Sequence, residues 1–130
     1  MAAVGSITES ISKTRTVKSI ALDWTSSAGG AVSGIPSTGI SGLIERVVFV
    51  PGASGVQPTD AYDVTLLDED GLDMLAGKGG NLSNANPTQI CPLVGDGTTT
   101  DHPVAVDGQL TLVVANAGAA KQGRVKLYYR

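Results

Sequence analysis

The side chains best suited to nucleophilic or acid–base catalysis are scarce in this sequence. His102 is its single histidine and Cys91 its single cysteine. A hydrolytic site would need a nucleophile beside a base, with a carboxylate to orient the imidazole. Asp101 is adjacent to His102, but neighbouring side chains in an extended chain point to opposite sides. We therefore expect no catalytic residue: His102 is predicted to be a loop residue, and Cys91 a small, buried apolar side chain.

An acidic segment, Asp68–Asp73, raises the question of calcium binding. Calcium needs several oxygen ligands that converge on one point, and an EF-hand loop with Gly71 at its sixth position would begin at Leu66, which has no ligand oxygen in its side chain. The segment is therefore predicted to be an acidic hairpin tip. Because the sequence also lacks glycine-rich phosphate-binding motifs, a Gly-x-Ser-x-Gly motif and any cluster of metal ligands, we expect neither a metal site nor a cofactor.

The charge of the chain argues against a nucleic-acid partner. Its formal net charge is −3 and its pI is about 4.9, whereas nucleic-acid-binding domains are usually basic. The charges are unevenly distributed, because Lys78 is the one base between Gln57 and Asp107, a region that holds most of the acids. Bases gather towards the two ends of the chain. One interpretation is a solvated surface of mixed charge; the other is an acidic flank that faces a basic neighbour.

No segment of the sequence indicates a membrane or a secretory route. No apolar run approaches the ~18–20 residues that span a bilayer, and residues 1–10 lack the basic and apolar regions of a signal peptide. At 130 residues the chain has the length of one domain with a modest core. We expect a protein that is made in the cytosol and does not bind membranes.

Hydrophobic alternation and frequent turn residues predict an all-β fold. The segments that alternate with period two, or are bounded like strands, are 15–24, 43–50, 62–67, 110–115 and 124–130. Seventeen glycines and six prolines supply turns between them. About eight short strands at near-even spacing are typical of a single-domain antiparallel β-sandwich or jelly roll. Helix is expected to be almost absent.

Two hairpins and a core follow from this interpretation. Asp70-Gly71 predicts a turn with a return strand over Leu72–Leu75, and Asp107-Gly108 predicts a hairpin that joins Val104–Val106 to Leu110–Ala115. The residues expected to be buried are Trp24, Leu43, Val47, Phe49, Val64, Leu66, Leu112, Val114 and Leu127.

Charge and apolar patterning also lead to expectations about strand pairing and assembly. The strands that carry Lys18 and Lys126 should lie in different sheets, or pair with these lysines out of register, because like charges repel when directly opposite. Segments 43–50 and 110–115 are apolar on both faces. A small domain rarely leaves such surface in water, so we expect an oligomer of identical chains.

The start of the chain is predicted to lie outside the β-domain. Residues 1–13 are small and polar with sparse apolar positions, so we expect a flexible N-terminal arm followed by a β-sandwich domain over 14–130. An arm laid across a neighbouring protein could bury its apolar side chains and set its bases behind them. The candidate partner-binding residues are Val4, Ile7, Ile11, Lys13 and Arg15.

Several segments give the chain a resemblance to a family of small virion structural proteins of tailed bacteriophages. They are ALDWTS at 21–26, YDVTLLDEDG at 62–71, VAVDGQLTLVVANAG at 104–118 and KLYYR at 126–130. The similarity extends over nearly the whole chain, but it consists of structural patterns and contains no chemical motif.

The resemblance implies a non-enzymatic β-sandwich built into the virion. The leading role is capsid decoration, in which a cement protein binds the major capsid protein or other virion proteins on the capsid surface after assembly in the bacterial cytoplasm. Family analogy suggests a homotrimer. The alternatives are a head–tail connector, a tail or baseplate component, or a carbohydrate-binding surface module. A sugar site would need an exposed aromatic side chain, for which Trp24 is the candidate.

Overall fold

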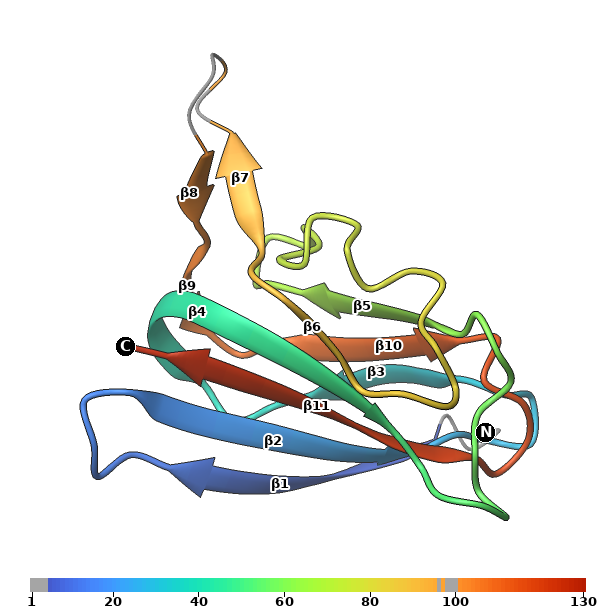
Figure 1. Ribbon diagram of the computed structural model, residues 1–130. Coiled ribbons are helices and arrows are strands. Elements are labelled where there is room, and N and C mark those ends of the chain that lie inside the picture. The colour runs from blue at the N-terminus through green and yellow to red at the C-terminus, as the bar shows by residue number, and fades with distance from the viewer. Residues whose placement is uncertain (1–4, 96, 98–100) are drawn as a thin grey trace.

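The computed structural model describes residues 5–95, 97 and 101–130, and no helix occurs among them. Antiparallel strands account for the architecture (Figure 1), which confirms the all-β prediction. The strands are β1 Ser6–Ser12, β2 Lys18–Thr25, β3 Val32–Pro36, β4 Ile40–Pro51, β5 Asp63–Leu67, β6 Thr88–Ile90, β7 Leu93–Gly95, β8 Asp101–Pro103, β9 Ala105–Gly108, β10 Thr111–Ala115 and β11 Gln122–Tyr129.

Two curved sheets enclose one hydrophobic core, an arrangement consistent with a small β-sandwich. The larger sheet has the order β1-β2-β11-β4-β6, with β9 also paired to β4, and the smaller sheet has the order β3-β10-β5. A third pair, β7 and β8, forms a hairpin that stands away from the body in Figure 1. The jelly-roll alternative stays a prediction, because these pairings establish the sheets and not that strand order.

The predicted core is confirmed except at Leu43, which is 44% exposed. The neighbouring Ile44 is fully buried in its place. The reason is a bulge in β4: Tyr128 of β11 pairs with Arg46, whereas the next residue, Tyr129, pairs with Ile44. One extra residue in a strand reverses the alternation of its side chains, so the simple period-two pattern puts Leu43 on the wrong face.

The two predicted hairpins are wrong in their return strands. β9 pairs with β4 in the larger sheet, whereas β10 pairs with β3 and β5 in the smaller one. Gly108 therefore marks a crossover between sheets, with a φ of 135° that favours glycine. After β5, the chain turns at Gly71, but Leu67 and Asp73 form a single bridge, and the buried Met74 and Leu75 belong to the loop that follows.

The strands with like charges avoid direct repulsion by their register. β2 and β11 lie side by side in one sheet, but Lys126 pairs with Ala21 and Lys18 pairs with Tyr129. The out-of-register alternative is thus confirmed. Arg124 is placed opposite Asp23, and its Nε lies 2.6 Å from the Asp23 Oδ1.

The segment expected to be an arm is partly built into the sheet. Ser6–Ser12 forms β1, which pairs along its whole length with β2, so a domain boundary at residue 13 does not match the structure. The physical reason is that Ile7, Glu9 and Ile11 recur with period two on the side of the core. Ile7 packs against the core, and the Glu9 carboxylate accepts a hydrogen bond from the backbone N–H of Thr38.

Trp24 and Tyr62 connect the two sheets at the centre of the core. Each is 1% exposed, and their ring centroids lie 5.8 Å apart with the planes tilted by 51°. Tyr62 immediately precedes β5 of the smaller sheet, while Trp24 lies on β2 of the larger one. Such tilted aromatic pairs contribute stability beyond the area they bury.

We predict that Phe49→Ala will strongly destabilise the fold. Phe49 is 1% exposed and lies opposite Val125 of β11 and Thr88 of β6. Truncation should lower the free energy of unfolding by about 3–5 kcal/mol, measured by chemical denaturation. Val48→Ala, on the opposite face of the same strand, serves as the control and should cost about 1 kcal/mol or less. Equal losses in the two variants would contradict the observed register.

The buried phenol of Tyr62 should make the protein less stable in alkali. Burial raises the pKa of Tyr62 to about 12. The unfolded chain therefore loses this proton first as the pH rises above about 10, and stability falls by about 2–3 kcal/mol by pH 12. Tyr62→Phe lacks this group, so its unfolding free energy relative to the parent protein should rise over that interval. A difference that does not change with pH would contradict the prediction.

Candidate functional site

The acidic segment uses its carboxylates to shape a turn. Asp68 Oδ1 accepts hydrogen bonds from the backbone N–H groups of Asp70 and Leu72, at 2.9 and 3.0 Å. The carboxylate of Asp73 accepts bonds from the N–H groups of Leu66, Leu75 and Gly77, at 3.2, 3.0 and 2.9 Å. These bonds engage the carboxylates of Asp68 and Asp73 with the backbone of the turn. Within the described residues, no group of three or more His, Cys, Asp or Glu side chains is arranged to hold a metal.

Cys91 and His102 lie on different elements: Cys91 is between β6 and β7, and His102 is in β8. Cys91 is exposed, so the prediction that it is buried is wrong. It lies between the edge strand β6 and the hairpin, where its side chain is exposed. His102 lies within strand β8, opposite Val94 of β7, and not in a loop as predicted. The register therefore pairs His102 with an aliphatic residue.

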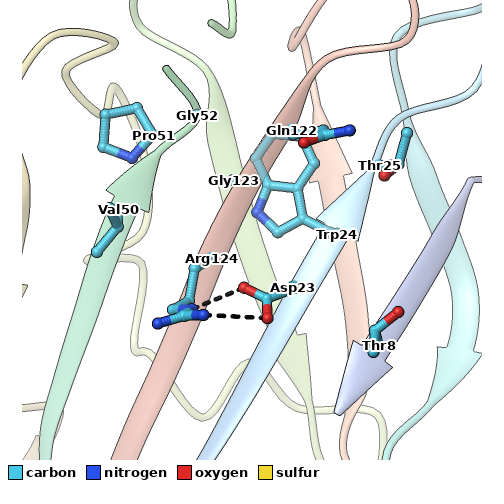
Figure 2. A pocket seen from close by; sticks show the side chains of 10 residues that line it. All are labelled: Thr8, Asp23, Trp24, Thr25, Val50, Pro51, Gly52, Gln122, Gly123 and Arg124. Carbon is cyan, nitrogen blue, oxygen red and sulfur yellow. Dashed lines mark hydrogen bonds and ion pairs between the residues drawn. The ribbon is translucent and has the colours of Figure 1, made fainter. Parts of the chain in front are cut away.

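Trp24 is enclosed and cannot offer its face to a sugar. A side-chain carbon at Gly123 would collide with the indole ring, which means that the backbone of β11 packs directly on Trp24. The indole Nε1 is buried and has no hydrogen-bond partner among the described residues. Figure 2 shows the indole beside Gly123, next to an open hollow of about 500 Å³. The carbohydrate-binding alternative therefore loses its one candidate aromatic residue.

The floor of that hollow is a polar part of the larger sheet. The Asp23 and Arg124 side chains face each other across neighbouring strands, joined by two hydrogen bonds of 2.6 and 3.2 Å (Figure 2). The hydrogen bond to Asp23 raises the pKa of Arg124 above its ordinary value. Farther along β11, the Tyr128 ring lies between Lys126 and Arg46, whose cationic groups are 4.9 and 5.1 Å from its centroid. This face carries paired and stacked charges and lacks a concave, apolar pocket.

The residues predicted to bind a partner have different environments. Val4 lies outside the described residues. Ile7 is half-buried against the core and unavailable, whereas Ile11 is 39% exposed at the end of β1. Lys13 and Arg15 are exposed in the loop that joins β1 to β2. Three of the predicted residues therefore remain at the surface, at one end of the sandwich.

The hairpin of β7 and β8 is an exposed, projecting element that the sequence pattern missed. Its two strands pair only with each other among the described residues, in the register Leu93 to Pro103 and Gly95 to Asp101. Apart from Leu93, its described residues are exposed, and Val94 is 47% exposed. The break at Pro92 predicted an edge or a bulge for segment 89–94, but nothing in the alternation indicated that the chain leaves the sheet there.

Among the described residues, no helix is long and apolar enough to cross a membrane.

The surface of the protein offers exposed strands, a projecting hairpin and charged loops. These features are suited to contact with another protein. A comparison of the chain with family models, curated protein sequences and solved structures found no match.

Proposed function

We propose that this chain is a non-enzymatic virion structural protein of a tailed bacteriophage, a capsid decoration protein that binds the major capsid protein on the outside of the head. Two supports carry the proposal. One is the resemblance of segments 21–26, 62–71, 104–118 and 126–130 to small phage virion proteins. The other is the shape of the molecule, a closely packed sandwich from which one hairpin projects.

The projecting hairpin is the observation that most favours a binding role. An isolated two-stranded hairpin is at best marginally stable in water, and β7 and β8 contribute little to the core because their described residues are largely exposed. Val94 also presents an aliphatic side chain to solvent, with 47% of its surface exposed. A neighbouring protein that covers the hairpin would bury this side chain and order the strands.

The body of the molecule suits a cement protein for a separate reason. Its loops are fastened by buried polar contacts: Ser26 Oγ donates to the carbonyl oxygen of Gly118 and accepts from the N–H of Lys121, at 2.6 and 2.8 Å. Such a rigid scaffold loses little entropy when it binds. Because many copies attach to one particle, and an oligomer presents several contacts at once, weak individual contacts can sum to tight binding.

The copy number on the particle tests this role. Purified protein added to particles that lack it should bind saturably, in copy numbers that scale with the number of capsomers, and should raise the temperature at which the heads rupture. Quantitative mass spectrometry of the particles measures the first quantity, and a thermal release assay for DNA measures the second. Binding limited to a single ring of subunits, with no effect on head rupture, would instead assign the chain to the connector or the tail.

A substitution in the hairpin tests the contact surface. Val94→Asp should weaken binding to particles by roughly tenfold or more, because it places a charge at the centre of the proposed interface. Ala53→Asp, at an exposed loop position away from the hairpin, is the control and should bind like the parent protein. Both variants should keep the melting temperature of the parent. Full binding by Val94→Asp would exclude the hairpin as the main contact.

A further inference from the structure

Exposed apolar side chains gather at one end of the sandwich. Of the large hydrophobic side chains that are exposed in the described residues, Ile11, Val17 and Leu43 lie at or beside the strand ends that meet here. The pairings explain why: the end of β1 lies beside the start of β2, which lies beside the end of β11, which lies beside the start of β4. The ends of four strands thus meet here (Figure 1).

The acidic turn, residues 68–73, reaches the same end from the smaller sheet. The Glu69 carboxylate occupies the space where a side chain at Gly108 would lie, and Gly108 pairs with Ile40 at the start of β4. The turn is held in shape by Asp68 and Asp73, as described above. Glu69 and Asp70 are left exposed, and Leu72 in the same turn has 66% of its surface exposed.

The basic loop, residues 13–18, has the opposite charge and a similar apolar content. Lys13 and Arg15 are exposed, and they are flanked by Ile11 and Val17, which are 39% and 46% exposed. Lys18 lies 5.8 Å from the centroid of the Tyr129 ring.

The two charged patches form no ion pair with each other among the described residues. Among the described residues, the ion pairs within 4 Å are Arg124 with Asp23 and Arg130 with Glu45, so Lys13, Arg15, Glu69 and Asp70 have no such partner. A hollow of about 400 Å³, lined by residues that include Lys13, Lys18, Ile40, Asp107 and Tyr129, lies at this end beside the basic loop. The fold therefore presents an acidic patch and a basic patch at one end, each with exposed apolar side chains and neither neutralised.

We propose that the acidic turn of one copy binds the basic loop of the next copy, with Leu72 packed against Ile11 and Val17 and with Glu69 and Asp70 facing Lys13 and Arg15. Opposite charges that face each other across an interface fix its register and exclude wrong partners. The contact uses different surfaces on the two copies, so it is heterologous, and such contacts close into rings when the rotation permits. This surface deepens the proposed function, since it supplies the self-association that a multivalent decoration protein needs.

A second copy accounts for this end better than an unrelated partner does. An acidic peptide or another polyanion would neutralise the basic loop but leave the acidic turn and Leu72 in water. A cationic partner would do the reverse. In a ring of identical copies, the neighbour on one side covers the acidic turn and the neighbour on the other side covers the basic loop, because the chain carries the two complementary surfaces itself.

Charge reversal and restoration test the contact. Lys13→Glu combined with Arg15→Glu should weaken self-association by on the order of tenfold or more, and so should Glu69→Lys combined with Asp70→Lys. In either double variant the turn and the loop carry charge of the same sign, so the contact cannot form. The chain that carries all four substitutions has opposite charges again and should regain the oligomer. Light scattering and analytical ultracentrifugation measure the mass. Leu72→Ser should also dissociate the oligomer, without any change of charge.

The controls separate this contact from a general effect of charge. Lys78→Glu combined with Lys121→Glu changes the net charge as much as Lys13→Glu with Arg15→Glu does, but at other positions. This control should leave the mass of the oligomer unchanged. High salt should favour the monomer of the parent protein, since the screening length falls to about 3 Å at 1 M. The circular dichroism spectrum should be that of the parent in every variant, whereas the variants that dissociate should melt at a lower temperature than the parent oligomer, because assembly stabilises the folded state by mass action.

The outcomes distinguish this inference from the proposed function. If the parent protein is a monomer at micromolar concentration, if the oligomer survives both reversals, or if the fourfold substitution fails to restore it, then the proposed contact is wrong. Binding of the same proteins to particles is measured separately. Saturable binding of many monomers would retain the decoration role and overturn the ring, whereas a ring that does not bind particles would retain the contact and overturn the role.

Discussion

The C-terminal strand β11 lies in the middle of the larger sheet, hydrogen-bonded to β2 on one side and to β4 on the other. Its inward side chains, Val125, Leu127 and Tyr129, are buried under the smaller sheet. The two strands that β11 joins come from the first half of the printed sequence, so the sheet closes only when residues 122–129 are in place. Pairings between such distant segments are slow to form, and the rest of the sandwich depends on this one.

Close packing around β11 limits what the molecule can do chemically. Gly123 brings the β11 backbone against Trp24, and Trp24 in turn contacts Tyr62 of the other layer. Polar side chains in the described loops are mostly engaged in holding the backbone. Asp63, for example, accepts hydrogen bonds from the N–H of Asn81 and from the side-chain amide of Asn116, at 2.9 and 2.7 Å. The carboxylates of Asp63, Asp68 and Asp73 thus fasten loop backbone that lies outside the strands.

The exposed elements divide the surface into parts with different chemistry. One end combines the basic loop and the acidic turn, while the β7 and β8 hairpin extends from the opposite edge of the larger sheet relative to β1 (Figure 1). β1 leaves one sheet edge uncovered by another strand, and Glu9 points inward there and bonds to Thr38. An inward charge at an edge strand discourages random strand-to-strand association. Specific contacts at the loop end and at the hairpin can thus coexist with a monodisperse protein.

The sequence by itself determined the fold class and most of the core, because alternation with period two is a local property of each strand. Val47, Phe49, Leu112 and Leu127 could be placed inside for this reason. The same logic failed at Leu43, where a bulge seen only against β11 reverses the alternation.

Tertiary structure alone decided which strands pair. Asp107-Gly108 has the local signature of a hairpin turn, yet β9 finds its partner in β4 and β10 finds its partners in β3 and β5. The candidate sites divide in the same way. Composition showed that histidine and cysteine occur once each, as His102 and Cys91. The pattern of residue types made Ile11, Lys13 and Arg15 candidates for a contact. The basic loop and the acidic turn are at least fifty residues apart in the printed sequence, and they reach the same end through sheet register, which no local pattern encodes.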